Sequence, residues 1–197
     1  MQAPQTAAAP APTLKTRIGA HIDDVASLLR ALSPADVAPV VELIHETRRE
    51  GGVVYVFGNG GSAATAMHFC NDLHANCADH NPPLRVQCLA SNLSTLLALA
   101  NDTGYENVFV GQLQSLAPED TVIAISASGN SENCVRAVAR ARELGARSVG
   151  LVGFDGGRLA ELCAQVIHIP RHDYLAVEDV HSVLCHAIAR GLRPAAA

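Results

Sequence analysis

The fold is decided by the stretch Val53-Val54-Tyr55-Val56-Phe57-Gly58-Asn59-Gly60-Gly61-Ser62. Its first five residues are β-branched or aromatic and predict a buried strand. The glycines that follow permit a tight turn, and helical periodicity then continues from residue 62 to about residue 75. This stretch therefore predicts a strand that passes through a glycine-rich loop into a helix, which is the unit of parallel α/β sheets.

Four further apolar runs of strand length follow, at 85–89, 121–125, 148–152 and 165–169. Segments with helical periodicity separate and follow them, at 93–100, 106–116, 131–144, 156–163 and 178–191. This alternation predicts an α/β fold: a doubly wound parallel sheet of about five strands between two layers of helices. Ligands of such folds bind beyond the carboxyl ends of the strands, so we look for function in the loops found there.

Two amphipathic helices are predicted before the first strand. Apolar residues recur at three- and four-residue steps from Leu14 to Leu32, and Ser33-Pro34 supplies an N-cap and a first-turn proline for a second helix that ends at Gly51-Gly52. Neither helix can bury its apolar stripe alone. We therefore expect them to pack on the following domain or on another subunit, which makes self-association an expectation.

Composition limits the class of protein. Hydrophobic residues make up 49% of the 197 residues and charged residues 17%, which excludes wholesale disorder, and the apolar stretches are too short to cross a bilayer. The formal charge of −5 argues against direct binding of nucleic acid over a broad surface. We expect a soluble protein without a membrane partner, and the six cysteines read as buried reduced thiols.

The chain is expected to form one domain, 14–192, which includes the helical pair 14–50. The Ala/Pro-rich segment 1–13 predicts a disordered tail, and 193–197 a second tail. Because the first residues lack a basic segment followed by an apolar core, they do not resemble a secretory signal, and a cytoplasmic location follows as the expectation.

The first loop, Gly58-Asn59-Gly60-Gly61-Ser62-Ala63, offers glycines and free backbone N–H groups at the start of a helix, which favours an anion. It also matches G-x-G-x-x-A, a dinucleotide motif, but the next strand ends in Ala90-Ser91-Asn92 without an acidic residue for a ribose. A Walker loop is excluded because no lysine follows the glycines. A purely structural turn stays the alternative.

A second loop, Ser126-Ala127-Ser128-Gly129-Asn130-Ser131, follows the strand 121–125 and opens the helix 131–144. Its small polar side chains and N-terminal amides form a neutral cluster of donors that suits a phosphate monoester. The alternative is that Ser131 is only a helix N-cap and that the other polar residues belong to an ordinary turn. This alternative explains Ser131 but not the other polar residues. The two loops together therefore favour phosphate binding.

Ionisable residues on two helices could supply chemistry beside the loops. His68 and Asp72 stand four residues apart and so share one helix face, although a surface ion pair would explain them equally. The last helix offers Glu178, Asp179, His181 and His186. These residues could supply a general base, a general acid or metal ligands, but Glu178 and His186 are separated by about 12 Å of helix rise.

The segment Asn101-Asp102-Thr103-Gly104 is an ordinary turn and cap signal. Within it, Asp102 is a candidate for contacts with hydroxyl groups of a polar ligand.

Five motifs in this order resemble the sugar isomerase (SIS) family, from about Leu14 to Leu192: 57–62 (FGNGGS), 66–69 (AMHF), 100–105 (ANDTGY), 126–131 (SASGNS) and 153–157 (GFDGG). The resemblance implies a flavodoxin-like SIS fold and a homotetramer with active sites between subunits. It implies an aldose–ketose isomerase acting on a phosphorylated sugar, with sedoheptulose 7-phosphate and a manno-heptose 7-phosphate as the interconverted pair.

The resemblance also implies roles for individual residues. Asp72 and His186 match the catalytic pair that moves a proton through an enediol. Some relatives bind zinc at positions that match His68, Asp72, Glu178 and His186, and no organic cofactor is implied. The resemblance also implies that the phosphate is held by Ser126, Ser128, Asn130 and Ser131, with Asn59 and Ser62 nearby. Together with Gly60 of the first loop and Asp102, these are the predicted substrate-binding residues.

The chain departs from the family pattern at functional positions. The family usually has Glu at the position of Asp72 and Gln at the position of Glu178, and sugar-contacting Asp and Arg residues fall here on Leu175 and Ala176. The exact sugar is therefore open. Two non-catalytic alternatives also remain: an adaptor that binds a bacterial replication initiator, and a sugar-phosphate sensor.

Overall fold

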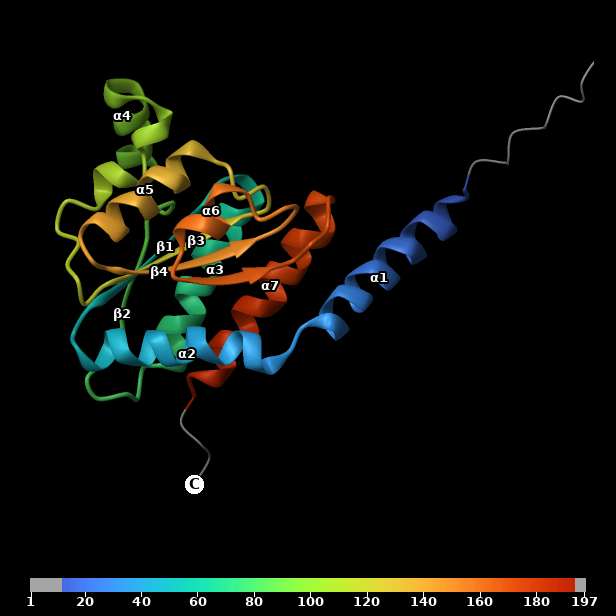
Figure 1. Ribbon diagram of the computed structural model, residues 1–197, viewed down its shortest axis with the longest axis horizontal. Helices are drawn as coiled ribbons and strands as arrows, with labels where there is room; N and C mark the ends of the chain where they lie inside the picture. The colour runs from blue at the N-terminus through green and yellow to red at the C-terminus, as the bar shows by residue number, and fades with distance from the viewer. Residues whose placement is uncertain (1–11, 194–197) are drawn as a thin grey trace, which may run out of the picture.

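The computed structural model describes residues 12–193, and it forms a parallel five-stranded sheet covered by helices on both faces (Figure 1). Most of the predicted tails, 1–13 and 193–197, lies outside the described residues. The strands are β1 (Val53–Gly58), β2 (Arg85–Cys88), β3 (Thr121–Ser126), β4 (Arg147–Val152) and β5 (Gln165–His168). The helices are α1 (Leu14–Ala31), α2 (Pro34–Arg49), α3 (Gly60–Asn76), α4 (Leu93–Thr103), α5 (Glu132–Glu143), α6 (Gly157–Leu162) and α7 (Tyr174–Gly191).

The strand order is β2-β1-β3-β4-β5, with every neighbouring pair parallel. From β1 the chain first winds outward to β2 and then crosses back to β3, so the direction of winding reverses between β1 and β3. Loops that leave the carboxyl ends of two such strands separate and leave a crevice, which is where ligands bind in open α/β sheets. The two polar loops of the sequence follow β1 and β3, and the sheet topology therefore places both beside this crevice.

Successive side chains of each strand point to opposite faces and feed two separate hydrophobic cores. Val54 and Val56 pack with α2, α3 and α7, whereas Tyr55 and Phe57 pack with α5, α6 and the segment around Phe109. Strand β3 is buried along its whole length, as expected for the centre of a doubly covered parallel sheet. The predicted three-layer α/β fold is confirmed.

The predicted helix 106–116 is wrong. The segment forms only two short 3-10 turns, Tyr105–Asn107 and Val110–Gln112. The amide of Gln112 donates to the carbonyls of Leu89 and Val108, which anchors the segment on the sheet edge. Side-chain bonds of this kind compete with a continuous helix, and apolar spacing alone does not reveal them.

Helix α1 extends away from the α/β body (Figure 1). Its carboxyl-terminal half packs against the core through Val25, Leu28 and Leu29. The amino-terminal half leaves Leu14, Ile18 and Ile22 at 66%, 54% and 60% exposure. Within residues 12–193, none of the helices combines the length and apolar character that a membrane span requires.

Candidate functional site

The two polar loops line a single pocket at the carboxyl ends of β1 and β3. Its volume is about 110 Å³, and its lining consists of Asn59, Ser62, Ile125, Ser126, Ala127, Ser128, Ser131, Tyr174 and Glu178. Hydroxyl groups of the second loop face the N-terminal turn of α3 across this space. The two loops, which the sequence places after different strands, therefore meet at one pocket in the structure.

Backbone N–H groups at two helix ends are available to a ligand here. Helix α3 begins at Gly60 and α5 at Glu132, and neither N-cap residue, Asn59 or Ser131, accepts a hydrogen bond from its helix through its side chain. Ser131, at the N-cap of α5, leaves its hydroxyl 3.5 Å from that of Ser126. Free N–H groups and the positive ends of two helix dipoles make the pocket suitable for a phosphate, without any lysine or arginine in its lining.

Close packing explains why glycine is required in the first loop. A side chain at Gly58 would come within 2.6 Å of the Ile125 carbonyl oxygen and 2.8 Å of the Ser62 Cβ. Gly60 has a φ of +53°, in the left-handed region where L side chains are strained. Glycine at these positions lets β1, β3 and α3 approach each other, which brings the two loops together.

The side chain of Asn59, which lines the pocket, is held by a hydrogen-bond network. Its side-chain amide exchanges two hydrogen bonds of 2.9 Å with that of Asn133 on α5, and the hydroxyl of Tyr105 donates to its carbonyl oxygen at 2.7 Å. Asn133 is 2% exposed. The amide pair therefore ties the first loop to the start of α5 and fixes the width of the pocket.

A carboxylate shares the pocket with these donors. Glu178 of α7 contributes to the lining, and its carboxylate packs against Gly61 at the first turn of α3. Burial, followed by the charge of Asp179, raises the pKa of Glu178 above its ordinary value. The pocket that offers neutral hydrogen-bond donors to an anion therefore also contains the carboxylate of Glu178.

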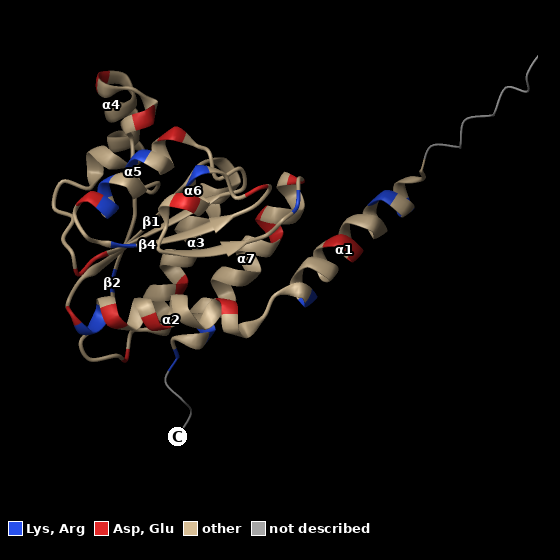
Figure 2. Ribbon diagram, in the orientation of Figure 1, with Lys and Arg blue, Asp and Glu red and all other residues tan. Residues whose placement is uncertain are grey.

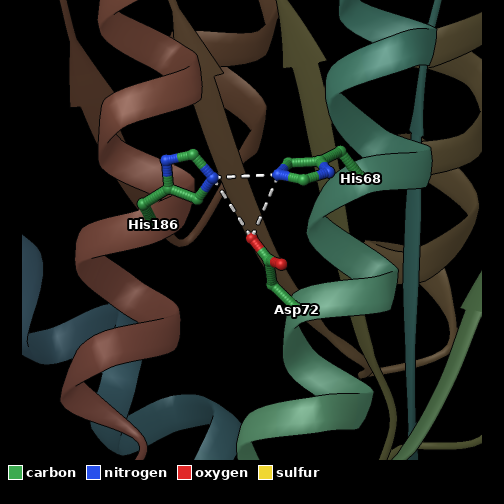
Figure 3. A group of neighbouring side chains, drawn as sticks. All are labelled: His68, Asp72 and His186. Carbon is green, nitrogen blue, oxygen red and sulfur yellow. Dashed lines mark hydrogen bonds and ion pairs between the residues drawn. The ribbon is translucent and has the colours of Figure 1, made fainter.

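Three ionisable side chains converge farther along α3 and α7 (Figure 3). His68 and Asp72 come from α3 and His186 from α7, and their ligand atoms all lie within 4.8 Å of one another. The two histidine Nε2 atoms are 2.9 Å apart, and Asp72 Oδ2 lies 3.5 Å from that of His68 and 3.3 Å from that of His186. The carboxylate is mostly covered, with 18% side-chain exposure, while both imidazoles are more than half exposed.

Asp72 Oδ2 is the atom that this arrangement leaves unsatisfied. It is buried and has no hydrogen-bond partner in the part of the chain that the structure describes. Ligands about 2.0–2.2 Å from a tetrahedral zinc ion lie about 3.3–3.6 Å apart, close to the separations between Asp72 and the two histidines. The donor set of two imidazoles and one carboxylate therefore fits a divalent cation.

The model of the SIS domain family matches residues 20–153. The chain belongs to the SIS domain family.

Individual relatives agree with this assignment. The chain is 38% identical over 176 residues to the phosphoheptose isomerase of Geotalea daltonii, which covers 89% of this chain and 91% of that protein. It is 44% identical over 142 residues to the phosphoheptose isomerase of Mycobacterium tuberculosis, which covers 72% of each chain. The solved structure of phosphoheptose isomerase GmhA from Neisseria gonorrhoeae superposes with a TM-score of 0.83 at 28% identity, and covers 91% of this chain and 98% of that one.

Not every predicted site residue of this SIS domain lies in the pocket or in the histidine–aspartate cluster. Glu178 is separate from the three converging residues, since it lines the pocket two helical turns before His186. Asp102 lies on α4, where its carboxylate accepts a hydrogen bond from Asn101, and it does not line the pocket. The side chain of Asn130 bonds to Ser128 and Arg158 backbone groups and supports the second loop.

Two other ionisable residues of α7, His181 and Asp179, have a role in the fold and not in the site. His181 is fully buried, and burial lowers its pKa to about 4, so its ring is neutral. Asp179 lies 2.9 Å from His21 of α1 and joins that helix to α7. Neither residue belongs to the pocket or to the cluster of His68, Asp72 and His186.

Sequence reasoning missed two residues that shape the site. Asn133 was not singled out, because an amide in the first turn of a helix carries no signal for a partner 74 residues away. Tyr174 lines the pocket from the start of α7, which begins at Tyr174 and not near 178 as predicted. The N-cap of α7 is Asp173, whose side chain accepts a hydrogen bond from the backbone N–H of Ala176. An aspartate at this position is a typical helix N-cap, and it was the sequence signal that could have located the start of α7.

Proposed function

We propose that this chain is a phosphosugar aldose–ketose isomerase that interconverts sedoheptulose 7-phosphate and a manno-heptose 7-phosphate. Relatives that bear the name phosphoheptose isomerase match most of the chain at 35–44% identity, and two solved structures with TM-scores of 0.83 and 0.81 bear the same name. The site geometry supplies independent support for a substrate of this class.

The observation that carries the proposal is the spacing between the phosphate pocket and the ionisable cluster. Ser62 lines the pocket, and His68 and Asp72 follow it on α3 by six and ten residues. The rise along the helix is therefore about 9–15 Å. Inorganic phosphate could reach only one of these places, whereas a phosphorylated sugar chain could reach both.

The chemistry follows from the groups present. The loops hold the phosphate, and Asp72 and His186 face the other end of the substrate as the proton-transfer pair. One of them removes the proton next to the carbonyl carbon, and returning it to the neighbouring carbon converts ketose to aldose through an enediol. Partial burial of Asp72 and its two imidazole neighbours keep it oriented for this transfer.

We extend the proposal to a zinc ion held by His68, Asp72 and His186. When bound, it would supply positive charge that stabilises an enediolate, and because it would occupy Asp72 Oδ2 and the His186 Nε2, the proton would then be moved by the second carboxylate oxygen of Asp72. The support is the unsatisfied Asp72 oxygen and the nitrogen and oxygen donor set described above. Glu178 is not part of this set in the structure.

Metal removal tests that extension without an activity assay. Wild-type protein should contain about one zinc ion per chain, and chelation should lower its unfolding free energy by about 3 kcal/mol where free zinc had been about a hundredfold above its Kd. His68→Ala should lose both the metal and the chelator response. His74→Ala, an exposed histidine on the same helix, is the matched control and should retain both. Metal-free wild-type protein after zinc loading would contradict the extension.

We also propose a homotetramer. A groove of about 560 Å³ lies between α2 and α7 and is lined mainly by apolar side chains, among them Leu32, Val37, Val41 and Val183. The exposed apolar stripe of α1 is a complementary surface, and Figure 2 shows only scattered charges along that helix. Helices that protrude with exposed apolar stripes are stabilised when other copies cover them.

The catalytic proposal is tested by proton exchange in heavy water. Sedoheptulose 7-phosphate and a panel of other ketose and aldose phosphates are incubated with wild-type protein, and deuterium at the carbon next to the carbonyl is measured with and without chelator. His186→Ala should lose at least about a hundredfold in rate, as expected for removal of a general acid or base. His74→Ala should exchange like wild type. Absence of exchange with every substrate at saturating zinc would indicate a non-catalytic SIS protein instead.

A further inference from the structure

An aromatic cluster lies at the rim of the phosphate pocket. Tyr174 lines the pocket, and its ring packs edge-on against Phe154, with the ring centroids 4.7 Å apart and 68° between the ring planes. Phe154 also stacks on His172, at 5.1 Å and 14°. Phe154 belongs to the motif 153–157 (GFDGG), to which the proposed chemistry assigns no role. The cluster therefore joins the loop after β4 to the start of α7, beside the pocket.

The backbone of Phe154 is strained. Among residues 12–193 it is the single non-glycine residue with a positive φ, +48°, in the left-handed region that bulky side chains rarely adopt. Its N–H donates to the carbonyl of Arg171 at 3.2 Å, and its carbonyl oxygen accepts a hydrogen bond of 2.8 Å from Nε2 of His168. The surrounding segments thus hold this conformation, and strain that is held in this way clusters at ligand sites.

The loop that carries Phe154 is fixed to the second loop of the pocket, 126–131. Gly153 donates its N–H to the carbonyl of Ala127 at 2.9 Å, and Leu159 donates its N–H to the carbonyl of Gly129 at 3.0 Å. Both acceptors belong to the second loop. Phe154 lies between the two donors in the chain, so its place relative to the pocket is defined, and so is that of the tyrosine ring that packs on it.

The Tyr174 ring is available to a ligand, because it is 58% exposed at the first position of α7. The hydroxyl and amide groups of the pocket suit the phosphate itself, whereas the face of an aromatic ring carries partial negative charge and does not attract an anion. The part of a phosphate monoester that fits an aromatic ring is its carbon chain. Contact with C–H groups there removes apolar surface of both partners from water.

Tyr105 provides an internal comparison. It is 60% exposed and also contacts the pocket, but its hydroxyl donates to the carbonyl oxygen of the Asn59 side chain at 2.7 Å. Tyr105 therefore acts through its hydroxyl, on the first loop. Tyr174 is held through its ring, by Phe154, which points to a role for the ring and not for the hydroxyl.

We propose that Tyr174 is a specificity-determining residue. Its ring contacts the carbon chain next to the phosphate of an organic phosphate monoester, and Phe154 is the residue that positions the ring. This role rests on the proposed function, because the two loops must first hold the phosphate. The ring then lets the site discriminate an organic phosphate from inorganic phosphate through an aromatic contact beside the loops.

Binding measurements on the full-length protein test this role. The ligands are inorganic phosphate and glucitol 6-phosphate, a sugar-alcohol phosphate without a carbonyl, and calorimetry measures both Kd values at one zinc concentration. Tyr174→Ala should raise the Kd of glucitol 6-phosphate at least about fivefold, as expected when about 40 Å² of apolar contact is lost, and should change that of inorganic phosphate less than about twofold. Tyr174→Phe should bind both ligands like wild type. Leu97→Ala, which removes a similarly exposed apolar side chain from α4, is the matched control and should also bind both like wild type.

Three results would overturn the role of Tyr174. Equal weakening of both ligands in Tyr174→Ala would mean that the ring only supports the loops. Unchanged binding of both ligands would mean that the ring does not touch the carbon chain. A loss in Tyr174→Phe as large as that in Tyr174→Ala would assign the contact to the hydroxyl.

Phe154→Gly tests the positioning role and stays informative if Tyr174→Ala fails to fold. Glycine adopts the positive φ without strain, so the change removes the ring and keeps the backbone conformation. Because Tyr174 must then be ordered on binding, the Kd of glucitol 6-phosphate and the KM of the phosphosugar should rise about two- to threefold, with kcat unchanged. A lower kcat with unchanged Kd and KM would refute the positioning role. Since glucitol 6-phosphate needs no proton transfer, a failed isomerase assay contradicts only the proposed function, while an unselective Tyr174→Ala variant contradicts only this inference.

Discussion

Glu178 puts a carboxylate inside a pocket whose other groups favour an anion. The side chain packs against the first turn of α3, so it competes with a phosphate for the same helix end and repels it at short range. We therefore expect this single residue to weaken phosphate binding without contributing to the cluster of His68, Asp72 and His186.

Glu178→Gln should lower the Kd for inorganic phosphate and the KM for the phosphosugar about tenfold at low ionic strength, and less at high salt. Since burial raises the pKa of Glu178, lower pH neutralises part of its charge, and the advantage of the Gln variant should shrink as pH falls. Phosphate titrations by calorimetry measure the effect. Asp179→Asn removes the same charge from the neighbouring position, and an equal gain in that control would refute the local explanation.

His181 links stability to pH. Burial holds its folded-state pKa at about 4, below the ordinary 6.5, so the unfolded chain binds a proton that the folded chain does not. Its contribution to stability is complete above pH 6.5 and is lost as pH falls toward 4, by about 3 kcal/mol at about 1.4 kcal/mol per pH unit.

His181→Gln should therefore show a smaller loss of unfolding free energy between pH 6.5 and 4 than wild type, even if the variant is less stable at neutral pH. Urea unfolding across this range provides the measurement. His74→Gln, on the exposed face of α3, should retain the wild-type pH dependence. Parallel pH profiles for wild type and His181→Gln would rule out this assignment.

At the scale of elements, the amide pair of Asn59 and Asn133 joins two chain segments that each fold locally. Asn133→Ala removes both hydrogen bonds of this amide pair and leaves Asn59 with the Tyr105 hydroxyl and a long contact to the Cys134 sulfur, which should cost about 1–3 kcal/mol of unfolding free energy.

The same change should raise KM more than it lowers kcat, because it widens the phosphate pocket and leaves the cluster on α3 and α7 in place. Steady-state kinetics and thermal unfolding report the two effects. Asn133→Asp keeps the acceptor for the Asn59 amide and should be milder in both, and an Asp variant as damaged as the Ala variant would argue against the hydrogen-bond explanation.

The elements that sequence predicts well are those specified by local signals. Strand β1, its glycine loop and the serine loop after β3 combine apolar runs, positive-φ glycines and cap residues, and all were predicted at the right place. The helix expected at 106–116 failed because the apolar spacing does not reveal the hydrogen bond of Gln112 to the distant carbonyl of Leu89. Local spacing also paired His68 with Asp72, whereas the approach of His186 depends on how α3 packs against α7 and came only from the family resemblance.

At the scale of the whole molecule, α1 is the helix whose apolar residues a single chain leaves exposed. Its amino-terminal half carries an apolar stripe into solvent, while the middle of the helix is joined to the body by the contacts of His21 with Asp179 and Asp24 with Arg171. These contacts fix the direction of the helix at its base, so the exposed stripe is presented outward and other copies can bury it.

Ile18→Asp places a charge in the middle of that stripe and should shift the solution mass from tetramer to smaller species, because a charge cannot be buried at an apolar contact without a partner. Light scattering measures the mass. Ala20→Asp adds the same charge on the other side of the exposed helix and should remain tetrameric. Phosphate binding should survive in the dissociated Ile18→Asp protein, since both loops of the pocket belong to one chain, and a variant that keeps the wild-type mass would show that the stripe does not mediate assembly.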